Sequence, residues 1–178
     1  MRYFYCTMIL IMQTSLLVAN PLPKCVYISS YHQGYSWSDG IEKVLRETLE
    51  GHCTFIQFNM DTKHHKEETS IKQKAKEAKE LIDRTNLSVV ITSYDNAAKY
   101  VIAPYYKNSS IPFVFCGINW TAEEYGFPTK NITGMIEVSP IKEIFSLAIT
   151  ISKGKRGIFI GDNTITDKKD LTYFVKHA

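Results

Sequence analysis

The alternation of short apolar runs with amphipathic segments constrains the fold of this chain more than any other feature. Four runs, at 25–29, 54–58, 88–92 and 112–116, are rich in β-branched and aromatic residues. Each is nearly continuous in apolar character, as strands buried on both faces are. Segments with helical period separate them. The pattern predicts an α/β fold, a three-layer lobe with a parallel sheet.

Apolar residues gather on one face of each segment between these runs. The face of the first segment comprises Ile41, Val44, Leu45 and Leu49. The face of the second comprises Ile71, Ala75, Ala78, Leu81 and Ile82. The third segment, 96–103, is short and ends before Pro104. These faces predict helices that pack on a sheet.

A second block follows a turn-rich stretch at 120–133. It contains two predicted strands, 134–138 and 156–160, and a last helix from about Asp167. The helix between them has an inward face of Ile141, Ile144, Phe145, Ala148 and Ile149. Two strands are too few for an independent sheet. We therefore expect a first lobe at 24–120, a crossover or hinge at 121–138 and an incomplete second lobe at 139–178. A truncated gene product is favoured over a chain-swapped or assisted lobe.

The first twenty residues have the layout of a secretory signal peptide. Arg2 gives one positive charge, residues 3–19 carry none, and Ala19 precedes the helix-breaking segment Asn20-Pro21-Leu22-Pro23. The apolar segment is short for a membrane span, which needs about 20 residues. The sequence therefore predicts export and a periplasmic or extracytoplasmic location, with an uncleaved anchor as the alternative.

Charge and motifs narrow the function classes. With 21 Lys plus Arg against 18 Asp plus Glu, the net charge of +3 predicts no nucleic acid or membrane surface as partner. The sequence has no Gly-x-Ser-x-Gly, phosphate-loop or His-Glu-x-x-His motif. We expect neither an enzyme nor a cofactor. Cys116, beside Gly117, is a candidate nucleophile, but no motif supplies a base, so a buried thiol is favoured.

Cys25 and Cys53 each open an apolar run. If those runs are neighbouring parallel strands, both thiols lie at the same end of the sheet and a disulfide is possible. Two small buried side chains are an equally good interpretation.

Aromatic and hydrogen-bonding residues follow every predicted strand of the first lobe. The four segments are "YHQGYSW", "NMDTKHH", "SYDNAA" and "GINW". Open parallel sheets bind ligands beyond the carboxyl ends of their strands, where the strand order reverses. In a flavodoxin-like order the first and third segments flank that point. We therefore expect one cleft to be faced by Tyr31, His32, Tyr35, Trp37, Ser93, Tyr94 and Asp95.

Two helices are predicted to begin at this cleft. Ser36 and Asp39 fit an S-x-x-D capping box, and Asp95 or Asn96 can cap the third helix. Two helix amino ends in one crevice favour an anionic group on a ligand.

Structural roles compete with the binding roles of several residues. Trp37 is as well suited to packing the first helix as to stacking on a ligand. His32 is more often a hydrogen-bonded loop histidine than a base. His64 and His65 are adjacent and point in different directions, so surface histidines are favoured over a metal site. Asp61 is a candidate cap, cation ligand or solute contact.

Five segments, in order, resemble the substrate-binding proteins of ABC transporters with a type I periplasmic-binding-protein fold. They are "YISSYHQGYSWSDGI", "FNMDTKHH", "VVITSYDNAA", "IPFVFCGIN" and "NITGMIEV". The similarity runs from Lys24 to Val138 and more loosely to Asp170. They look especially like the branch whose domain also serves as the extracytoplasmic sensor of bacterial signalling proteins. The resemblance implies two α/β lobes that close over a small solute.

The resemblance also implies a set of ligand contacts. These are Tyr31, His32, Tyr35, Trp37, Asp61, Tyr94, Asp95, Gly117 and Asn119, with Asp162 and Asn163 across the cleft. It implies a polar solute with an apolar or aromatic part, delivered to an ABC permease, and some relatives are linked to aromatic amino acids. The alternatives are a sensing domain fused to or partnered with a histidine kinase or cyclase and, ranked lower, an α/β enzyme. The chain departs from the family in being much shorter.

Overall fold

A five-stranded parallel sheet organises the part of the chain that this computed structural model describes, residues 20–152, 154 and 156–177. Its strands are β1 (Lys24–Ser29), β2 (Thr54–Asn59), β3 (Val89–Ser93), β4 (Phe113–Asn119) and β5 (Ile132–Glu137). Their order is β2-β1-β3-β4-β5, and every neighbouring pair is parallel. The predicted α/β class and flavodoxin-like order are confirmed.

The predicted signal peptide at 1–20 falls outside the described residues except for Asn20. Among the residues that are described, no helix has both the length and the apolar character needed to cross a membrane. Export therefore stays a prediction.

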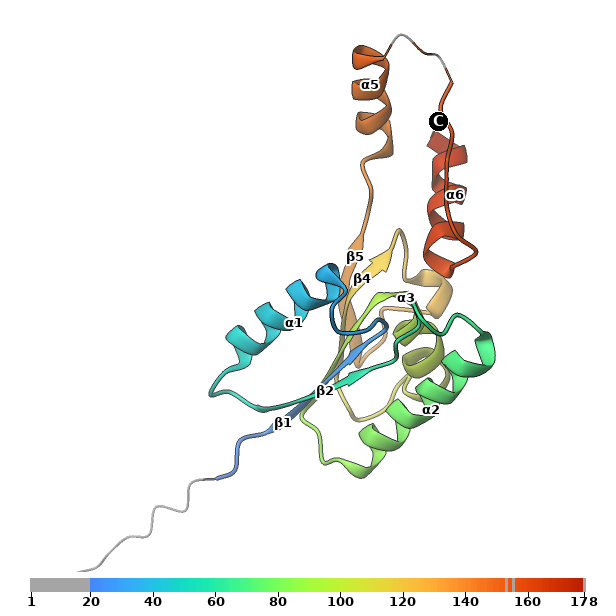
Figure 1. The fold of residues 1–178 in the computed structure, drawn as a ribbon. Coiled ribbons are helices and arrows are strands. Elements are labelled where there is room, and N and C mark those ends of the chain that lie inside the picture. Colours follow the sequence, from blue (N-terminus) through green and yellow to red (C-terminus); the bar gives the residue numbers. More distant parts are fainter. Residues whose placement is uncertain (1–19, 153, 155, 178) are drawn as a thin grey trace, which may run out of the picture.

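Helices cover both faces of the sheet (Figure 1). One face carries α1 (Ser36–Leu49). The other carries α2 (Glu68–Arg84) and a helix composed of α3 (Tyr94–Ala97), the π-helical η1 (Ala98–Ile102) and α4 (Ala103–Tyr105). The predicted face of α2 is confirmed, since Ile71, Ala75, Ala78 and Ile82 are buried and Leu81 packs against them. The apolar core lies between the sheet and these helices.

The predicted face of α1 is wrong at Val44, which is 60% exposed, whereas Ser38 and Glu42 are buried. Glu42 accepts hydrogen bonds from Arg46 Nε at 2.7 Å and from Gln57 Nε2, on β2, at 2.6 Å. These bonds hold Glu42 against β2. Residues 42 and 44 lie about 200° apart around a helix, so Val44 turns to solvent.

The helix after β3 is longer than the sequence predicts. It continues through Pro104 to Tyr105. The π-helical turn η1 directly precedes Ala103 and Pro104. Proline lacks an amide hydrogen and clashes with the carbonyl four residues earlier, and the wider π turn accommodates both constraints.

The run predicted at 134–138 belongs to the first sheet. After the short 3₁₀ helix η2 (Glu123–Tyr125), β5 pairs with β4 from Ile132 opposite Phe113 to Glu137 opposite Asn119. At Gly134 a Cβ would lie 2.0 Å from the Phe115 carbonyl oxygen, so the two strands approach closely there. Part of the predicted crossover at 121–138 is therefore the fifth strand.

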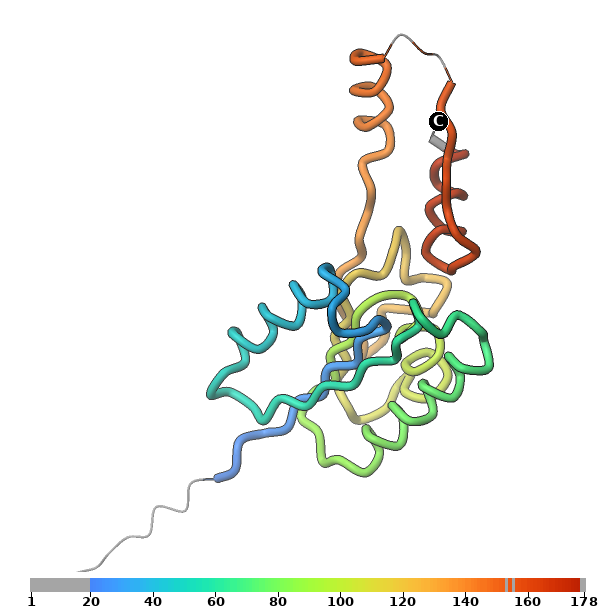
Figure 2. The backbone as a smooth tube through the Cα atoms, viewed as in Figure 1, coloured from blue at the N-terminus to red at the C-terminus, as the bar shows by residue number. Residues whose placement is uncertain are grey.

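Beyond β5 the chain leaves the sheet. The helix α5 (Ile141–Ile151) projects away from it, and α6 (Ile165–His177) returns to the end of β4 (Figures 1 and 2). Residues 156–160, predicted as a strand, pair with no strand in the described part of the chain. The predicted inward face of α5 is wrong at Ile144 and Ile149, which are 57% and 65% exposed, because no sheet of described residues lies beneath it.

Candidate functional site

The carboxyl ends of β1, β3 and β4 meet α6 around a cavity of about 190 Å³. β1 and β3 are neighbours in the sheet although β2 separates them in the chain, so the strand order reverses here. The cavity is lined by Tyr31, Tyr35, Trp37, Lys63, Tyr94, Asn119, Glu137, Ser139, Thr166 and Asp170. Tyr31, Tyr35, Trp37, Tyr94 and Asn119 are residues that the sequence predicts for a ligand site.

A larger hollow of about 460 Å³ lies along α1 and the loop before it. It is lined by the charged and amide side chains of Gln33, Asp39, Glu42, Lys43, Arg46 and Glu47. Open parallel sheets bind ligands at the carboxyl ends of their strands, where the strand order reverses. The smaller cavity lies at that point and four of its lining residues are aromatic, so it is the better candidate for a solute site.

Stacked tyrosines form one wall of this cavity. The Tyr31 and Tyr94 rings stack with centroids 4.3 Å apart, and Tyr35 meets Tyr31 edge-on at 5.2 Å. Lys63 Nζ lies 4.6 Å from the centroid of the Tyr31 ring and 5.2 Å from that of Tyr35, within the range of cation–π attraction. Burial raises the pKa of Tyr31 to about 12, so its hydroxyl stays protonated. Trp37, 62% exposed, stands at the rim.

Gly117 lies against the Tyr94 ring of this wall. A Cβ at Gly117 would lie 3.1 Å from the Tyr94 ring, and the backbone there has a φ of +65°, which favours glycine. Tyr94 itself has a φ of +67° at the turn from β3 into α3. Gly117 thus leaves room for the Tyr94 ring, and its predicted contact with a ligand stays a prediction.

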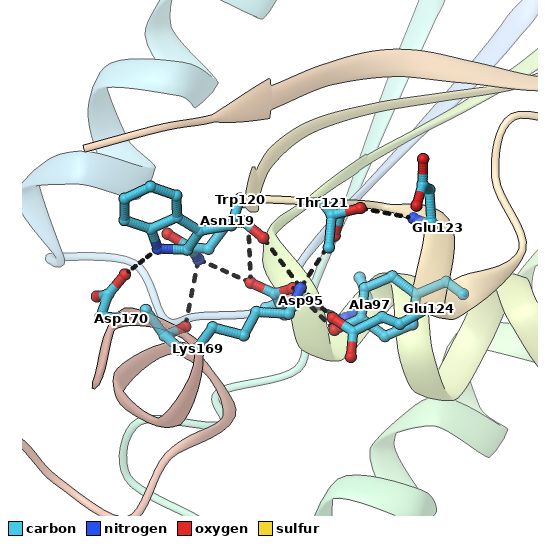
Figure 3. Close-up of polar contacts among 12 residues, drawn as sticks. Asp95, Ala97, Asn119, Trp120, Thr121, Glu123, Glu124, Lys169 and Asp170 are labelled. Atoms are coloured by element: carbon cyan, nitrogen blue, oxygen red, sulfur yellow. Dashed lines mark hydrogen bonds and ion pairs between the residues drawn. The ribbon is translucent and has the colours of Figure 1, made fainter. Parts of the chain in front are cut away.

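Asp95 is the buried chain neighbour of the cavity residue Tyr94 and is surrounded by hydrogen-bond donors (Figure 3). Its Oδ1 accepts hydrogen bonds from the Tyr125 hydroxyl at 2.8 Å and Lys169 Nζ at 2.6 Å. Its Oδ2 accepts from the Asn119 side chain at 2.7 Å and the Asn119 amide at 3.2 Å. The carboxylate and burial both raise the pKa of Tyr125, burial being the larger cause. Asp95 therefore joins β4, η2 and α6 by its hydrogen bonds, and its predicted contact with a ligand stays a prediction.

α6 closes the opposite side of the cavity. Lys169 also donates to the carbonyl oxygens of Asn119 and Thr121, at 3.0 and 3.1 Å, and pairs with Glu124 (Figure 3). Trp120 Nε1 donates to Asp170 at 2.6 Å, and the Trp120 ring stacks on Tyr173 with centroids 4.2 Å apart. These contacts bring Thr166 and Asp170 to the cavity wall.

Neither predicted helix cap forms as the sequence suggests. Tyr35 occupies the N-cap of α1, and Asp39 accepts from the Gly34 amide at 2.9 Å. In α3, the Ala97 amide donates to the Ser30 hydroxyl at 2.9 Å. The predicted caps do not form, because Asp39 bonds an amide two residues before Ser36, and Ser30, just after β1, takes the Ala97 amide of α3.

Two carboxylates in the cavity lining oppose the preference for an anionic ligand that the helix amino ends suggest. Glu137 and Asp170 both line it. Desolvation is the main cause that raises the pKa of the Glu137 carboxyl, with repulsion from Asp170 and Asp95 adding to it. Glu137 and Asp170 therefore favour a cationic group on a ligand, whereas Lys63 favours an anionic group.

His32 and Asp61 lie beside the cavity rather than in its lining. Asp61 Oδ1 accepts from His64 Nδ1 at 2.8 Å and lies 3.5 Å from His32 Nδ1. His65 Nε2 lies 3.7 Å from Asp61 Oδ2. The second strand-end loop thus turns its polar residues toward the first.

Asp162 and Asn163 lie across from this loop but do not line the cavity. Asp162 forms an ion pair with Lys66, whose hydrogen bond lowers the pKa of the Asp162 carboxyl. The Asn163 amide donates to Asp162 Oδ1 at 2.6 Å. Their predicted contact with a ligand stays a prediction.

The cysteines occupy structural positions. Cys25 and Cys53 form a disulfide with a Cα–Cα distance of 6.0 Å, so the structure selects the bonded alternative. Cys116 is a free thiol on β4, and burial raises its pKa to about 11. Little of it is thiolate near neutral pH, which makes it a poor nucleophile.

Sequence reasoning missed Lys63, Glu137, Ser139, Thr166 and Asp170 as cavity residues. Lys63 belongs to the quoted segment "NMDTKHH", and its place after a strand is a usable signal. Glu137 ends β5, within the quoted segment "NITGMIEV", and Ser139, Thr166 and Asp170 come after the sheet. Only the tertiary structure brings these four residues to the cavity.

Comparisons with known proteins bear on the fold. No protein-family model matches this chain, and no curated protein matches it. A solved structure described as the ABC domain in complex with L-Trp from Streptococcus pneumonia is similar, with a TM-score of 0.63 and 16% identity. The likeness covers 86% of this chain and 52% of that one, so this chain spans about half of its length. At this identity the likeness shows a shared α/β fold.

Proposed function

We propose that this chain is part of an extracytoplasmic solute-binding protein that delivers a small amino acid with an aromatic side chain to an ABC permease. The observation that carries the proposal is the cavity at the β1–β3 switch point, whose lining combines stacked tyrosines, Lys63 and two carboxylates. Small solutes of periplasmic-binding-protein folds are held by strand-end loops of this kind, as the sequence resemblance implies.

The charges of the cavity match a zwitterion. An ammonium group would lower the electrostatic cost of ionising Glu137 beside Asp170. A carboxylate would pair with Lys63, and an aromatic side chain would stack on Tyr31, Tyr35 or Trp37. The cavity is smaller than the roughly 300–1,000 Å³ of typical ligand pockets, which favours a single small solute. The neighbour of similar fold is described as binding L-Trp.

Isothermal titration calorimetry on the purified chain tests this proposal. The solutes are L-Trp, L-Tyr, L-Phe and, as an aliphatic comparison, L-Leu. We expect saturable binding of at least one aromatic amino acid, weaker binding of L-Leu, and about tenfold or greater weakening in Trp37→Ala and Lys63→Met. Tyr105→Ala, an exposed aromatic truncation on α4, is the matched control and should bind normally. Equal affinity in Trp37→Ala and the control, or no heat with any of the four at millimolar concentration, would contradict the proposal.

A further inference from the structure

We propose that His32, Asp61 and His64 form a zinc-binding site that joins the loops after β1 and β2. One ligand atom from each of these residues lies within 4.8 Å of the other two. Two imidazoles and one carboxylate are a ligand set that zinc accepts in proteins, with water completing the tetrahedron. The site lies beside the solute cavity and is independent of the proposed solute.

Two of the three distances between ligand atoms are close to those of a tetrahedral zinc site, and the third, between the two imidazoles, is at most 4.8 Å. With zinc–ligand bonds of about 2.0–2.1 Å, the ligand atoms of a tetrahedron lie about 3.3 Å apart. His32 Nδ1 and Asp61 Oδ1 are 3.5 Å apart. His64 Nδ1 and Asp61 Oδ1, now in a hydrogen bond, are 2.8 Å apart and need to open by less than 1 Å. Side-chain rotation alone supplies movements of this size.

A second observation that supports the zinc site concerns His32. Its Nδ1 is buried and has no hydrogen-bond partner within the described residues. Buried polar atoms of this kind are rare because an unmade hydrogen bond is costly. The His32 ring lies beside that of His64, with centroids 3.9 Å apart and planes tilted by 31°. A cation held by both nitrogens accounts for the buried Nδ1 and for the paired rings.

The loops that carry these ligands are held in place by backbone contacts. The Thr62 amide and hydroxyl both donate to the Ser30 carbonyl oxygen, at 3.0 and 2.8 Å. Thr62 Oγ1 also accepts from Asn96 Nδ2 at 2.7 Å. Thr62 directly follows Asp61 and Ser30 lies two residues before His32, so their bonds fix the two loops against each other. Such preorganisation lowers the cost of binding a metal.

His65 and Lys63 border the site without completing it. His65 Nε2 lies 3.7 Å from the second Asp61 oxygen, in a position to ligate only if the Asp61 carboxylate rotates. The Lys63 amine lies over the rings of Tyr31 and Tyr35 and so is directed to the solute cavity. The sequence alone disfavours a metal at His64-His65 because adjacent residues point in different directions. In the structure the other two ligands of the proposed site come from residues 32 and 61.

Calorimetric titration of zinc chloride into the purified chain tests the site. We expect one zinc per chain and about tenfold or greater loss of affinity in His32→Ala, His64→Ala and Asp61→Asn. His52→Ala, an exposed histidine on the turn before β2, is the matched control and should bind as the unchanged chain does. Cobalt substitution should give the visible spectrum of a tetrahedral site.

Three outcomes would overturn the site: no zinc uptake at about 100 µM, unchanged affinity in the His32→Ala/His64→Ala double variant, or equal losses in His52→Ala. Thermal melting of the metal-free variants shows whether a loss of affinity reflects unfolding. Solute titration of His64→Ala separates the two proposals, because solute binding should persist where zinc binding is lost.

Discussion

The Lys169 amine lies 2.6 Å from a carboxylate oxygen of Asp95, and this ion pair holds α6 against the first turn of α3. The Lys169 side chain is 10% exposed and that of Asp95 is 2% exposed. Burial makes the pair costly to break, because the remaining charge loses its partner without gaining water.

Lys169→Met should lower the free energy of unfolding by about 3 kcal/mol, measured by urea denaturation. Asp95 keeps three hydrogen bonds from Tyr125 and Asn119, which places the loss at the lower end of the usual range. Lys168→Met, one residue away and exposed, should change stability by less than about 0.5 kcal/mol. Similar effects of the two variants would show that α6 is not fastened by this pair.

Gly134→Ala should destabilise the β4–β5 pairing. The new methyl group would lie 2.0 Å from the Phe115 carbonyl oxygen, so the strands have to separate locally. We expect a loss of about 3 kcal/mol in thermal or urea unfolding. Gly40→Ala, on α1 with nothing within 4 Å of the added methyl, should instead stabilise by about 0.5–1 kcal/mol. A neutral Gly134→Ala would contradict the close approach of the strands.

Loss of the Cys25–Cys53 disulfide should destabilise the first lobe. The bond closes a loop across 28 positions, and the chain-entropy estimate for such a loop is about 3–4 kcal/mol. Cys25→Ala/Cys53→Ala should therefore unfold at lower urea concentration than the oxidised chain. Reduction of the unchanged chain should give the same shift, and Cys116→Ala should give neither. Equal stability of the oxidised and reduced chains would contradict this expectation.

Glu137 should make stability depend on pH. Its folded-state pKa is raised above the ordinary 4.5 of a glutamate, so the folded state holds the proton more tightly than the unfolded state. The resulting penalty is absent below about pH 4.5, grows as pH rises from that value through the folded pKa, and is complete above it. Glu137→Gln should therefore melt at a higher temperature than the unchanged chain at pH 7, with the difference disappearing near pH 4.

The same substitution should weaken aromatic amino acid binding, because it removes a charge that faces the solute ammonium. A variant that gained stability and lost affinity would fit both roles of Glu137. A melting difference between the two chains that did not vary between pH 4 and pH 7 would show that the carboxyl group is not desolvated.

The first four strands could be predicted closely from sequence because each is a continuous apolar run that needs burial on both sides. The predicted α2 face held for the same reason, since Ile71, Ala75, Ala78 and Ile82 recur at helical spacing against a sheet. The prediction at Val44 was wrong because a polar network at Glu42 outweighs the apolar pattern. Hydrophobic periodicity takes account of apolar residues only and does not detect such hydrogen bonds.

The second block was predicted less well. The run at 156–160 has strand composition, but a strand forms only where a neighbour offers backbone hydrogen bonds. The run at 134–138 found that neighbour in β4 and joined the first sheet. Composition therefore indicates that a segment can form a strand, while the available partner decides whether and where it does so.

The sequence by itself determined the parallel α/β lobe and the aromatic loop at its switch point, because hydrophobic periodicity and residue type are local properties. Tertiary structure alone decided that Asp95 is enclosed by Lys169 and Tyr125, and that Glu137 and Asp170 face the tyrosines. It also brought His32 to Asp61 and His64. These contacts join residues far apart in the chain, and only the packing of the strand ends against one another and against α6 brings them together.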